Sequence, residues 1–300
     1  MKNDSDKKIA ILAILLVAII GGGTGVLTKI TLKEISPPLF TFLRFLISSL
    51  VLFPLLLRGR VRLGRDLGKL ILVSFLATGN VLLFAYGIRL TTATISSLLY
   101  VLAPIVVAIL SYFMLKEKMN VRKSIGVIVG FVGAGLIILL PVIQKSSPFS
   151  GNLAGNLLIC LAVLSFSLYS VLSKKFQKEF SPIQLTTVFS ITTAFLMLIL
   201  LIGGLGSIGK QIGNLTTIGI FGILYVGILS TAVFYVLYQY AVKHGSPVLA
   251  STTLYLQPIS TTIWASIVLG ERLTPGLIIG GLIVIAGTYL ILNSGHKAQT

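Results

Sequence analysis

The feature that most constrains this chain is a series of continuous apolar runs, each about 20 residues long. A helix of that length crosses the ~30 Å hydrocarbon core of a bilayer. Hydrophobic side chains make up 55% of the 300 residues and charged side chains only 10%, whereas roughly a quarter of a soluble globular chain is charged. The pattern therefore predicts an integral membrane protein. A membrane barrel is not expected, because its segments of ~10 residues alternate polar and apolar side chains.

Gly, Pro and charge clusters divide the chain into ten predicted spans joined by short connections, so the expected fold class is an all-α membrane protein with ten transmembrane helices. The spans run over residues 9–28, 37–57, 68–88, 93–115, 121–142, 152–173, 182–203, 215–241, 247–269 and 275–293. The first span follows two lysines and imitates a signal peptide, but nine similar segments come after it. We therefore interpret it as an uncleaved helix.

Basic residues predict the orientation of these spans, since Lys and Arg accumulate in cytoplasmic connections. Of the 24 basic residues, seventeen fall on the side that holds the N-terminus, the connections after even-numbered spans and the C-terminal tail, and six fall on the other side. Both termini are expected in the cytoplasm and the protein in the plasma membrane. The same charges suit anionic lipid head groups. Nucleic-acid binding is not expected, because no basic face with interleaved aromatic residues lies outside the membrane.

The sequence also repeats itself. A shift of 154 positions lays residues 86–139 on residues 240–293 without a gap and places Pro104 on Pro258. The chain is therefore divided into a first five-helix repeat, 1–145, and a second five-helix repeat, 146–300, which has about nine extra residues between its second and third spans.

Because five is an odd number, the two repeats must cross the membrane in opposite directions. The charges agree: four basic residues follow the fourth span, whereas Arg272 alone follows the equivalent ninth span. Inverted repeats are the architecture of many secondary transporters, whose binding site lies near the midplane between the two halves. This pattern is the strongest functional signal in the chain.

Several short segments at equivalent places carry a family resemblance. They are Thr41-Phe42-Leu43-Arg44-Phe45, Ala103-Pro104, Leu115-Lys116-Glu117-Lys118, Leu256-Gln257-Pro258 and Leu269-Gly270-Glu271-Arg272-Leu273. Over nearly its whole length the chain resembles the EamA-type, ten-helix members of the drug/metabolite transporter superfamily. The resemblance implies export of amino acids or other small metabolites, although relatives exchange nucleotide sugars or sugar phosphates. Ile20 and Phe166 stand where that family commonly has Trp.

Polar and aromatic side chains in several spans are predicted to line a substrate site, because polar groups are unfavourable against lipid and should face the bundle interior. For any one of them, packing between helices is the alternative. The candidates are Asn80, Phe84, Tyr100, Ser165, Tyr169, Tyr235, Tyr238, Gln239, Tyr255, Gln257 and Trp264.

Glycine and proline mark candidate hinges. Gly22 and Gly25 belong to a glycine-rich run in the first span, which is typical of a flexible or partly unwound helix beside a transport site. Pro104 and Pro258 predict kinks at equivalent places in the fourth and ninth spans. Glycines spaced four apart in spans 121–142 and 275–293 are interpreted as helix packing, with a homodimer contact through these spans as the alternative.

Three cations are candidates for charge at the cavity mouths: Lys29, Arg44 and Lys174. Helix anchoring is the alternative for the two lysines, and for Arg44 the alternative is snorkelling to the membrane interface. Glu117 and Glu271 occupy equivalent helix ends, where local ion pairing or helix capping is the first interpretation.

No predicted span contains Asp, Glu or His, so neither an enzyme, a metal site nor a cofactor is expected. The same absence predicts that the protein does not exchange protons for lipophilic cations through an intramembrane carboxylate. The function expected is a secondary transporter, an exporter of small amphipathic metabolites such as amino acids. The alternatives are a sugar-phosphate or nucleotide-sugar exchanger, which needs a cluster of cations, and a non-transporting membrane scaffold or receptor.

Overall fold

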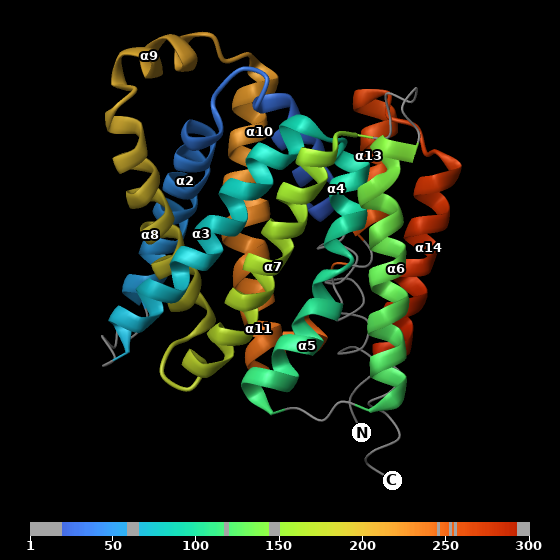
Figure 1. Cartoon of the computed structure of the whole chain (residues 1–300). Coiled ribbons are helices and arrows are strands. Elements are labelled where there is room, and N and C mark those ends of the chain that lie inside the picture. Colours follow the sequence, from blue (N-terminus) through green and yellow to red (C-terminus); the bar gives the residue numbers. More distant parts are fainter. Residues whose placement is uncertain are drawn as a thin grey trace, which may run out of the picture.

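The computed structural model describes residues 20–58, 66–116, 120–143, 151–244, 247–251, 254 and 257–292, and no strand occurs among them. After a first helix over residues 20–31, the elements are α2 (Pro37–Arg58), α3 (Leu67–Leu90), α4 (Ala93–Tyr100), α5 (Ala103–Leu115), α6 (Val121–Ile143), α7 (Leu153–Phe176), α8 (Pro182–Ile202), α9 (Leu205–Gly213), α10 (Thr217–Gly227), the π-helix η1 (Ile228–Val233), α11 (Phe234–His244), α12 (Pro247–Ser251), α13 (Gln257–Leu269) and α14 (Pro275–Leu292) (Figure 1).

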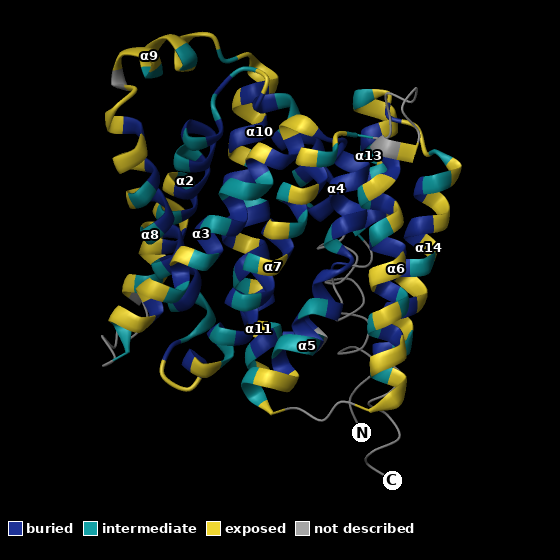
Figure 2. Ribbon diagram, in the orientation of Figure 1, coloured by how far each residue is buried: buried dark blue, intermediate teal, exposed yellow. Residues whose placement is uncertain are grey.

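The chain is an all-α membrane protein. Within the described residues, seven helical stretches are long and apolar enough to cross a membrane, with α4 and α5 forming one stretch and α10, η1 and α11 another. Large apolar side chains cover the outer faces, where Phe113 is 72% and Ile267 79% exposed, while buried residues gather between the helices (Figure 2). Such a surface suits lipid and not water. The count of ten spans remains a prediction.

Short polar residues explain where several helices begin. Thr92, Asn152, Ser181 and Thr216 precede α4, α7, α8 and α10, and each accepts a hydrogen bond from a backbone N–H of the first turn. The Gln184 side-chain oxygen in turn accepts a hydrogen bond from the Ser181 backbone N–H, which completes a capping box. Since a helix N-terminus leaves backbone donors without intrahelical partners, these caps fix each start inside an otherwise apolar sequence.

New helices begin at equivalent places within the fourth and ninth predicted spans. α4 ends at Tyr100 and α5 starts at Ala103, so Pro104 lies in the first turn of α5. Pro258 has the same place in α13, which starts at Gln257. Proline suits the first helical turn, because the N–H that it lacks would have no partner there. The structure thus places both prolines in the first turn of a helix, and their role as hinges stays a prediction.

The element bounds reproduce the internal repeat. α5 and α13 start at Ala103 and Gln257, 154 positions apart, and they end with the same offset. The residues that follow them, Lys116 with φ 57° and Gly270 with φ 65°, are both left-handed, which is a common way to end a helix. Two sequences that differ at most positions therefore fold into the same broken-helix unit.

Glycines bring α6 and α14 together along their length (Figure 1). A Cβ atom on Gly133 would lie 2.8 Å from the Gly280 carbonyl oxygen, and one on Gly287 would lie 2.6 Å from the Gly126 oxygen. Backbones can approach this closely only where no side chain intervenes. These glycines therefore pack helices within one chain, as predicted, while the homodimer contact stays a prediction.

The nine residues of α9 lie between α8 and α10, where the second repeat is longer than the first, and cross one end of the bundle (Figure 1). The turn after the first helix holds this region. The Glu34 carboxylate accepts hydrogen bonds from the Thr216 backbone N–H at 2.9 Å and the Thr216 hydroxyl at 2.7 Å. The Gln211 side chain accepts one from the Ser36 N–H at 2.8 Å. We refer to this part of the molecule as the α9 end.

Candidate functional site

A cavity of about 90 Å³ lies between the two repeats. It is smaller than the ~300 Å³ at which pockets for drug-sized ligands begin, so it suits a small molecule. Its lining is Gly21, Thr24, Gly25, Arg44, Asn80, Val81, Phe84, Ala93, Ser96, Ser97, Tyr100, Phe166, Ser230, Phe234, Tyr235, Leu254, Gln257 and Thr261.

Five of the predicted substrate residues lie on this cavity: Asn80, Phe84, Tyr100, Tyr235 and Gln257. They come from α3, α4, α11 and α13, and thus from both repeats. Of the four predicted hinge residues, Gly25 lines the cavity as well. Tyr255 lies outside the described residues.

Tyr238 and Gln239 lie elsewhere, although helical spacing places them beside Tyr235. The Tyr238 hydroxyl is 2.6 Å from the Ser170 hydroxyl, and the Gln239 side-chain oxygen accepts a hydrogen bond from Gln177 at 2.6 Å. Both side chains are buried. They face polar groups of α7 and of the turn that follows it, so the structure gives them a packing role and not a cavity role.

Ser165, Tyr169 and Trp264 are likewise absent from the cavity lining. Ser165 donates to the Leu76 carbonyl oxygen at 2.6 Å. Tyr169 is fully buried against Phe189, with ring centroids 5.4 Å apart. Trp264 packs against the apolar cluster around the first helix. Sequence periodicity shows that these residues avoid lipid, but not which neighbour they face.

One helical stripe contains the predicted residue Tyr100 together with lining residues that were not among the predicted candidates. Ala93, Ser96, Ser97 and Tyr100 are spaced i, i+3, i+4 and i+7 along α4 and all face the cavity. Such spacing places side chains on one face of a helix. Small hydroxyl side chains are common in membrane helices, so their presence in the sequence does not single out Ser96 and Ser97 as lining residues.

Aromatic rings form another wall. The ring of Tyr100 is 5.6 Å from Phe84 and 6.3 Å from Phe166, measured between centroids. Asn80 fixes Tyr100 by donating to its hydroxyl oxygen at 2.6 Å and to the Ala162 carbonyl oxygen at 2.8 Å. Phe166 therefore supplies an aromatic face to the cavity at the place where the resembled family commonly has Trp.

The glycine run of the first helix serves close packing. Residues 20–31 are continuously helical, so the described part of this span is not unwound as the run had suggested. A Cβ on Gly21 would lie 2.6 Å from the Gln257 amide nitrogen, and one on Gly22 would lie 2.7 Å from the Ser260 backbone. The glycines therefore let α13 of the second repeat approach the first helix beside the cavity.

Arg44 lines the cavity. Its side chain is only 4% exposed, which is incompatible with snorkelling to the interface. Its Nε donates to the Thr231 hydroxyl oxygen at 2.5 Å, and that hydroxyl donates to the Val226 carbonyl oxygen at 2.7 Å. Thr231 belongs to the π-helix η1. A π-helical turn inside an α-helix is frequent at functional sites.

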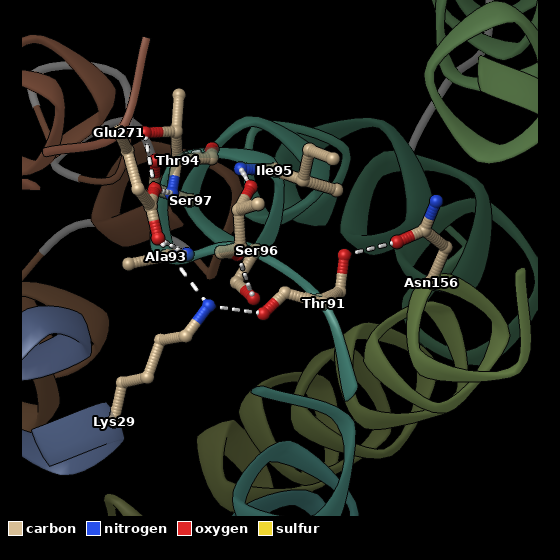
Figure 3. A network of polar contacts seen from close by, with 10 residues as sticks. Lys29, Thr91, Ala93, Thr94, Ile95, Ser96, Ser97, Asn156 and Glu271 are labelled. Atoms are coloured by element: carbon tan, nitrogen blue, oxygen red, sulfur yellow. Dashed lines mark hydrogen bonds and ion pairs between the residues drawn. The ribbon is translucent and has the colours of Figure 1, made fainter. Parts of the chain in front are cut away.

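At the α9 end, Glu271 joins the two repeats next to the cavity (Figure 3). Its carboxylate accepts hydrogen bonds from the backbone N–H groups of Ala93 at 2.9 Å and Thr94 at 3.0 Å, and from the Thr94 hydroxyl at 2.8 Å. It also pairs with the Lys29 ammonium at 3.3 Å. Glu271 thus caps a helix, but the helix is α4 of the other repeat and not its own neighbour in the sequence. Its ion-pair partner is Lys29.

The two candidate mouth lysines are engaged by the protein. Lys29 donates to the Thr91 carbonyl oxygen at 2.5 Å in addition to its contact with Glu271. Lys174 donates to the Val242 carbonyl oxygen at 2.7 Å and the Lys243 carbonyl oxygen at 3.2 Å. Cations suit these last carbonyls of α11 because of the helix dipole. Both lysines therefore anchor helix ends. Glu117 lies outside the described residues.

Comparison with known proteins agrees with this architecture. The profile of the EamA-like transporter family matches residues 8–139 and again residues 153–293. An uncharacterized transporter of Clostridium kluyveri is 29% identical over 262 residues, covering 85% of this chain and 83% of the relative. An uncharacterized transporter of Archaeoglobus fulgidus is 30% identical over 291 residues, covering 95% and 98%. A solved crystal structure shares the fold, with a TM-score of 0.68 at 17% identity and coverage of 96% and 98%.

Proposed function

The chain belongs to the EamA-like transporter family, and from that premise we propose that it is a secondary transporter that exports small amphipathic metabolites, amino acids among them, by alternating access. The observation that carries the proposal is a cavity with polar and aromatic walls, lined by both repeats, inside an apolar and lipid-suited shell. Its mixed lining suits a molecule with a polar head and an apolar body.

Alternating access needs contacts that can form at one end of the cavity and break. The Glu271 contact is of this kind, because it links the segment after α13 to the start of α4, in the other repeat. The broken helices provide the movable parts: α4 can tilt relative to α5 across Val101 and Leu102. Rocking of one repeat against the other around a fixed site is the common mechanism of such folds.

The charge distribution supports a place in the plasma membrane with both termini in the cytoplasm. In that orientation the α9 end faces outward, and the Glu271 contact closes the cavity against the outside. An exporter takes its cargo from the inside, so the closed outward end corresponds to a stage before release.

Exchange of phosphorylated substrates is not favoured by the site. A phosphate group carries close to two charges and is usually held by several cations. Arg44 is the one cationic side chain among the described lining residues, and Lys29 and Lys174 are engaged at helix ends. The lining therefore supports a substrate with a smaller charge.

The test is flux of radiolabelled amino acids into proteoliposomes, with a variant that fills the cavity. Ser97→Phe places a ring in the lining, whereas Ile267→Phe places the same ring on the outer face, where Ile267 is 79% exposed. We expect Ser97→Phe to abolish flux and Ile267→Phe to retain it. Absence of flux for every substrate in a metabolite panel, with folded wild-type protein, would favour the scaffold or receptor alternative instead.

A further inference from the structure

Arg44 is a buried charge for which the described residues supply no counter-ion. Within the described residues its side chain makes one hydrogen bond, from Nε to Thr231, and it stacks near the Phe45 ring, with Cζ 5.3 Å from the ring centroid. Thr231 is a neutral acceptor, and the two terminal guanidinium nitrogens remain for another partner. A guanidinium keeps its proton in proteins, so the site is permanently positive.

No acid of this chain can neutralise that charge from within the spans. The seven acids are Asp4, Asp6, Glu34, Asp66, Glu117, Glu179 and Glu271, and all of them lie outside the predicted spans. The four that the structure describes, Glu34, Asp66, Glu179 and Glu271, are not in the cavity lining. The undescribed residues beside Leu254 in the sequence contain no acid either, since positions 252–256 read Thr-Thr-Leu-Tyr-Leu. Glu271, which lies beside the cavity at the start of α4, uses both oxygens on α4 and Lys29.

Burying an unpaired charge is unfavourable, and in membrane proteins such residues are usually paired or functional. Here the arginine is held in place, because Thr231 fixes Nε and is itself fixed by the Val226 carbonyl oxygen in the π-helix η1. The fork of terminal nitrogens matches the two oxygens of a carboxylate, which arginine binds in a bidentate manner. A carboxylate of the cargo would therefore complete the site.

The aromatic lining residues indicate the chemistry of the rest of the cargo molecule. Phe84, Tyr100, Phe166 and Phe234 present aromatic surface to the cavity, which suits an apolar body. Because the described lining residues include one cation and no acid, a monoanion neutralises the site, whereas a cation is repelled and a dianion leaves excess negative charge.

We propose that Arg44 binds the carboxylate of the cargo, and that the cargo is a small carboxylate with one apolar substituent, either an α-amino acid or a simple organic acid. This inference rests on the proposed transport function and adds the chemical class of its substrate. The amino group of an amino acid has no acid to pair with in this lining, so the carboxylate is the group that selects the cargo.

The test compares ligands that share one branched apolar chain. Leucine, N-acetylleucine and isocaproate carry a carboxylate, which a neutral amide group replaces in leucinamide, N-acetylleucinamide and isocaproamide. Of these pairs, N-acetylleucine and isocaproate with their amides compare an anion with a neutral molecule, whereas leucinamide keeps the ammonium group of leucine. In thermal-shift and calorimetric measurements on purified protein, we expect the carboxylates to bind and their amides to bind about 10–100-fold more weakly, which is the effect of losing a charge-assisted contact. Leucine against N-acetylleucine and isocaproate shows whether the ammonium group contributes.

The Arg44→Gln variant should bind carboxylates and amides alike, and Arg44→Lys should recover part of the preference, since it keeps the charge but not the fork. Without ligand, Arg44→Met should melt no lower than wild type, because it removes an unpaired buried charge; a structural arginine would instead give a large drop. Equal binding of amides by wild type, a preference that survives in Arg44→Gln, or no shift with all three carboxylates would overturn the proposal. Flux of neutral substrates alone would leave the transport function standing and refute only the carboxylate assignment.

Discussion

Replacing Glu271 with glutamine should open the cavity at the α9 end. The glutamate uses both oxygens: Oε1 accepts from the Ala93 N–H and the Lys29 ammonium, and Oε2 accepts from the Thr94 N–H and hydroxyl. Glutamine keeps one acceptor oxygen and presents an NH2 group where the other was. It can therefore satisfy only one of the two α4 backbone donors, and it cannot pair with the lysine.

The size of the effect follows from these contacts. A buried backbone N–H left without an acceptor costs about 1–3 kcal/mol. Loss of the ion pair adds less than about 1 kcal/mol, because Lys29 is 21% exposed and solvent screens the pair. The closed state should lose about 2 kcal/mol relative to the open state, which is a shift of roughly 30-fold in their ratio.

Thiol labelling measures this ratio directly. A single cysteine at Ser97, in a Cys160→Ser background, faces the cavity and reacts with a membrane-impermeant reagent added on the α9 side only when that end is open. Glu271→Gln should raise the labelling rate ~30-fold. Arg272→Gln is the matched control, since it removes an exposed charge from the next residue, which makes no described contact with α4.

Two results would refute the reasoning. If Glu271→Gln lowers the melting temperature but leaves the labelling rate unchanged, the carboxylate stabilises the fold in both states and does not close the cavity. If Arg272→Gln raises the rate as much as Glu271→Gln does, the effect comes from net charge at this end and not from the α4 cap.

Three further outcomes are expected. Gln239→Leu should destabilise the protein by about 1–3 kcal/mol through lost buried hydrogen bonds, with ligand affinity unchanged in calorimetry, because Gln239 lies off the cavity. Gly287→Val should prevent a monodisperse folded preparation in size-exclusion chromatography, since a Cβ there meets α6 backbone at 2.5 Å, whereas Gly135→Val, which faces open space, should behave as wild type. A cysteine replacing Arg272 should react with an impermeant reagent outside intact cells, and one replacing Arg122 should not, as the inverted repeats and their charges require.

The class of fold and the repeat follow from the sequence because they depend on local and additive properties. Apolar runs long enough to span a bilayer must form helices there, since only internal hydrogen bonding satisfies their backbone. The repeated Pro104 and Pro258 predicted equivalent kinks, and α5 and α13 begin at equivalent residues. The left-handed ends at Lys116 and Gly270 obey the same offset, although lysine and glycine have little in common as side chains.

Only some of the residues that line the cavity could be predicted from the sequence. Helical periodicity predicts which face of a helix avoids lipid, but several helices compete to cover that face. Tyr235 and Tyr238 are one turn apart, and only Tyr235 reaches the cavity, because Ser170 of α7 meets the Tyr238 hydroxyl. The sequence does not distinguish a small lining residue such as Ser96 from the many other small residues of membrane helices. Ser96 lines the cavity because its short side chain does not fill the space.

What the sequence by itself determined is therefore a membrane protein built from a repeat, with few intramembrane charges; the opposite orientation of the two halves stays a prediction. What only the tertiary structure decided is the environment of those charges. From the sequence, Arg44 is close enough to a helix start to be predicted to snorkel. Glu271 is predicted in the same way to pair with the adjacent Arg272. In the fold, η1 fixes Arg44 inside the cavity, and α4 of the other repeat turns its backbone donors toward Glu271. The reason is physical: the energy of a charge depends on burial and on partners brought from distant parts of the chain, which spacing along one helix does not encode.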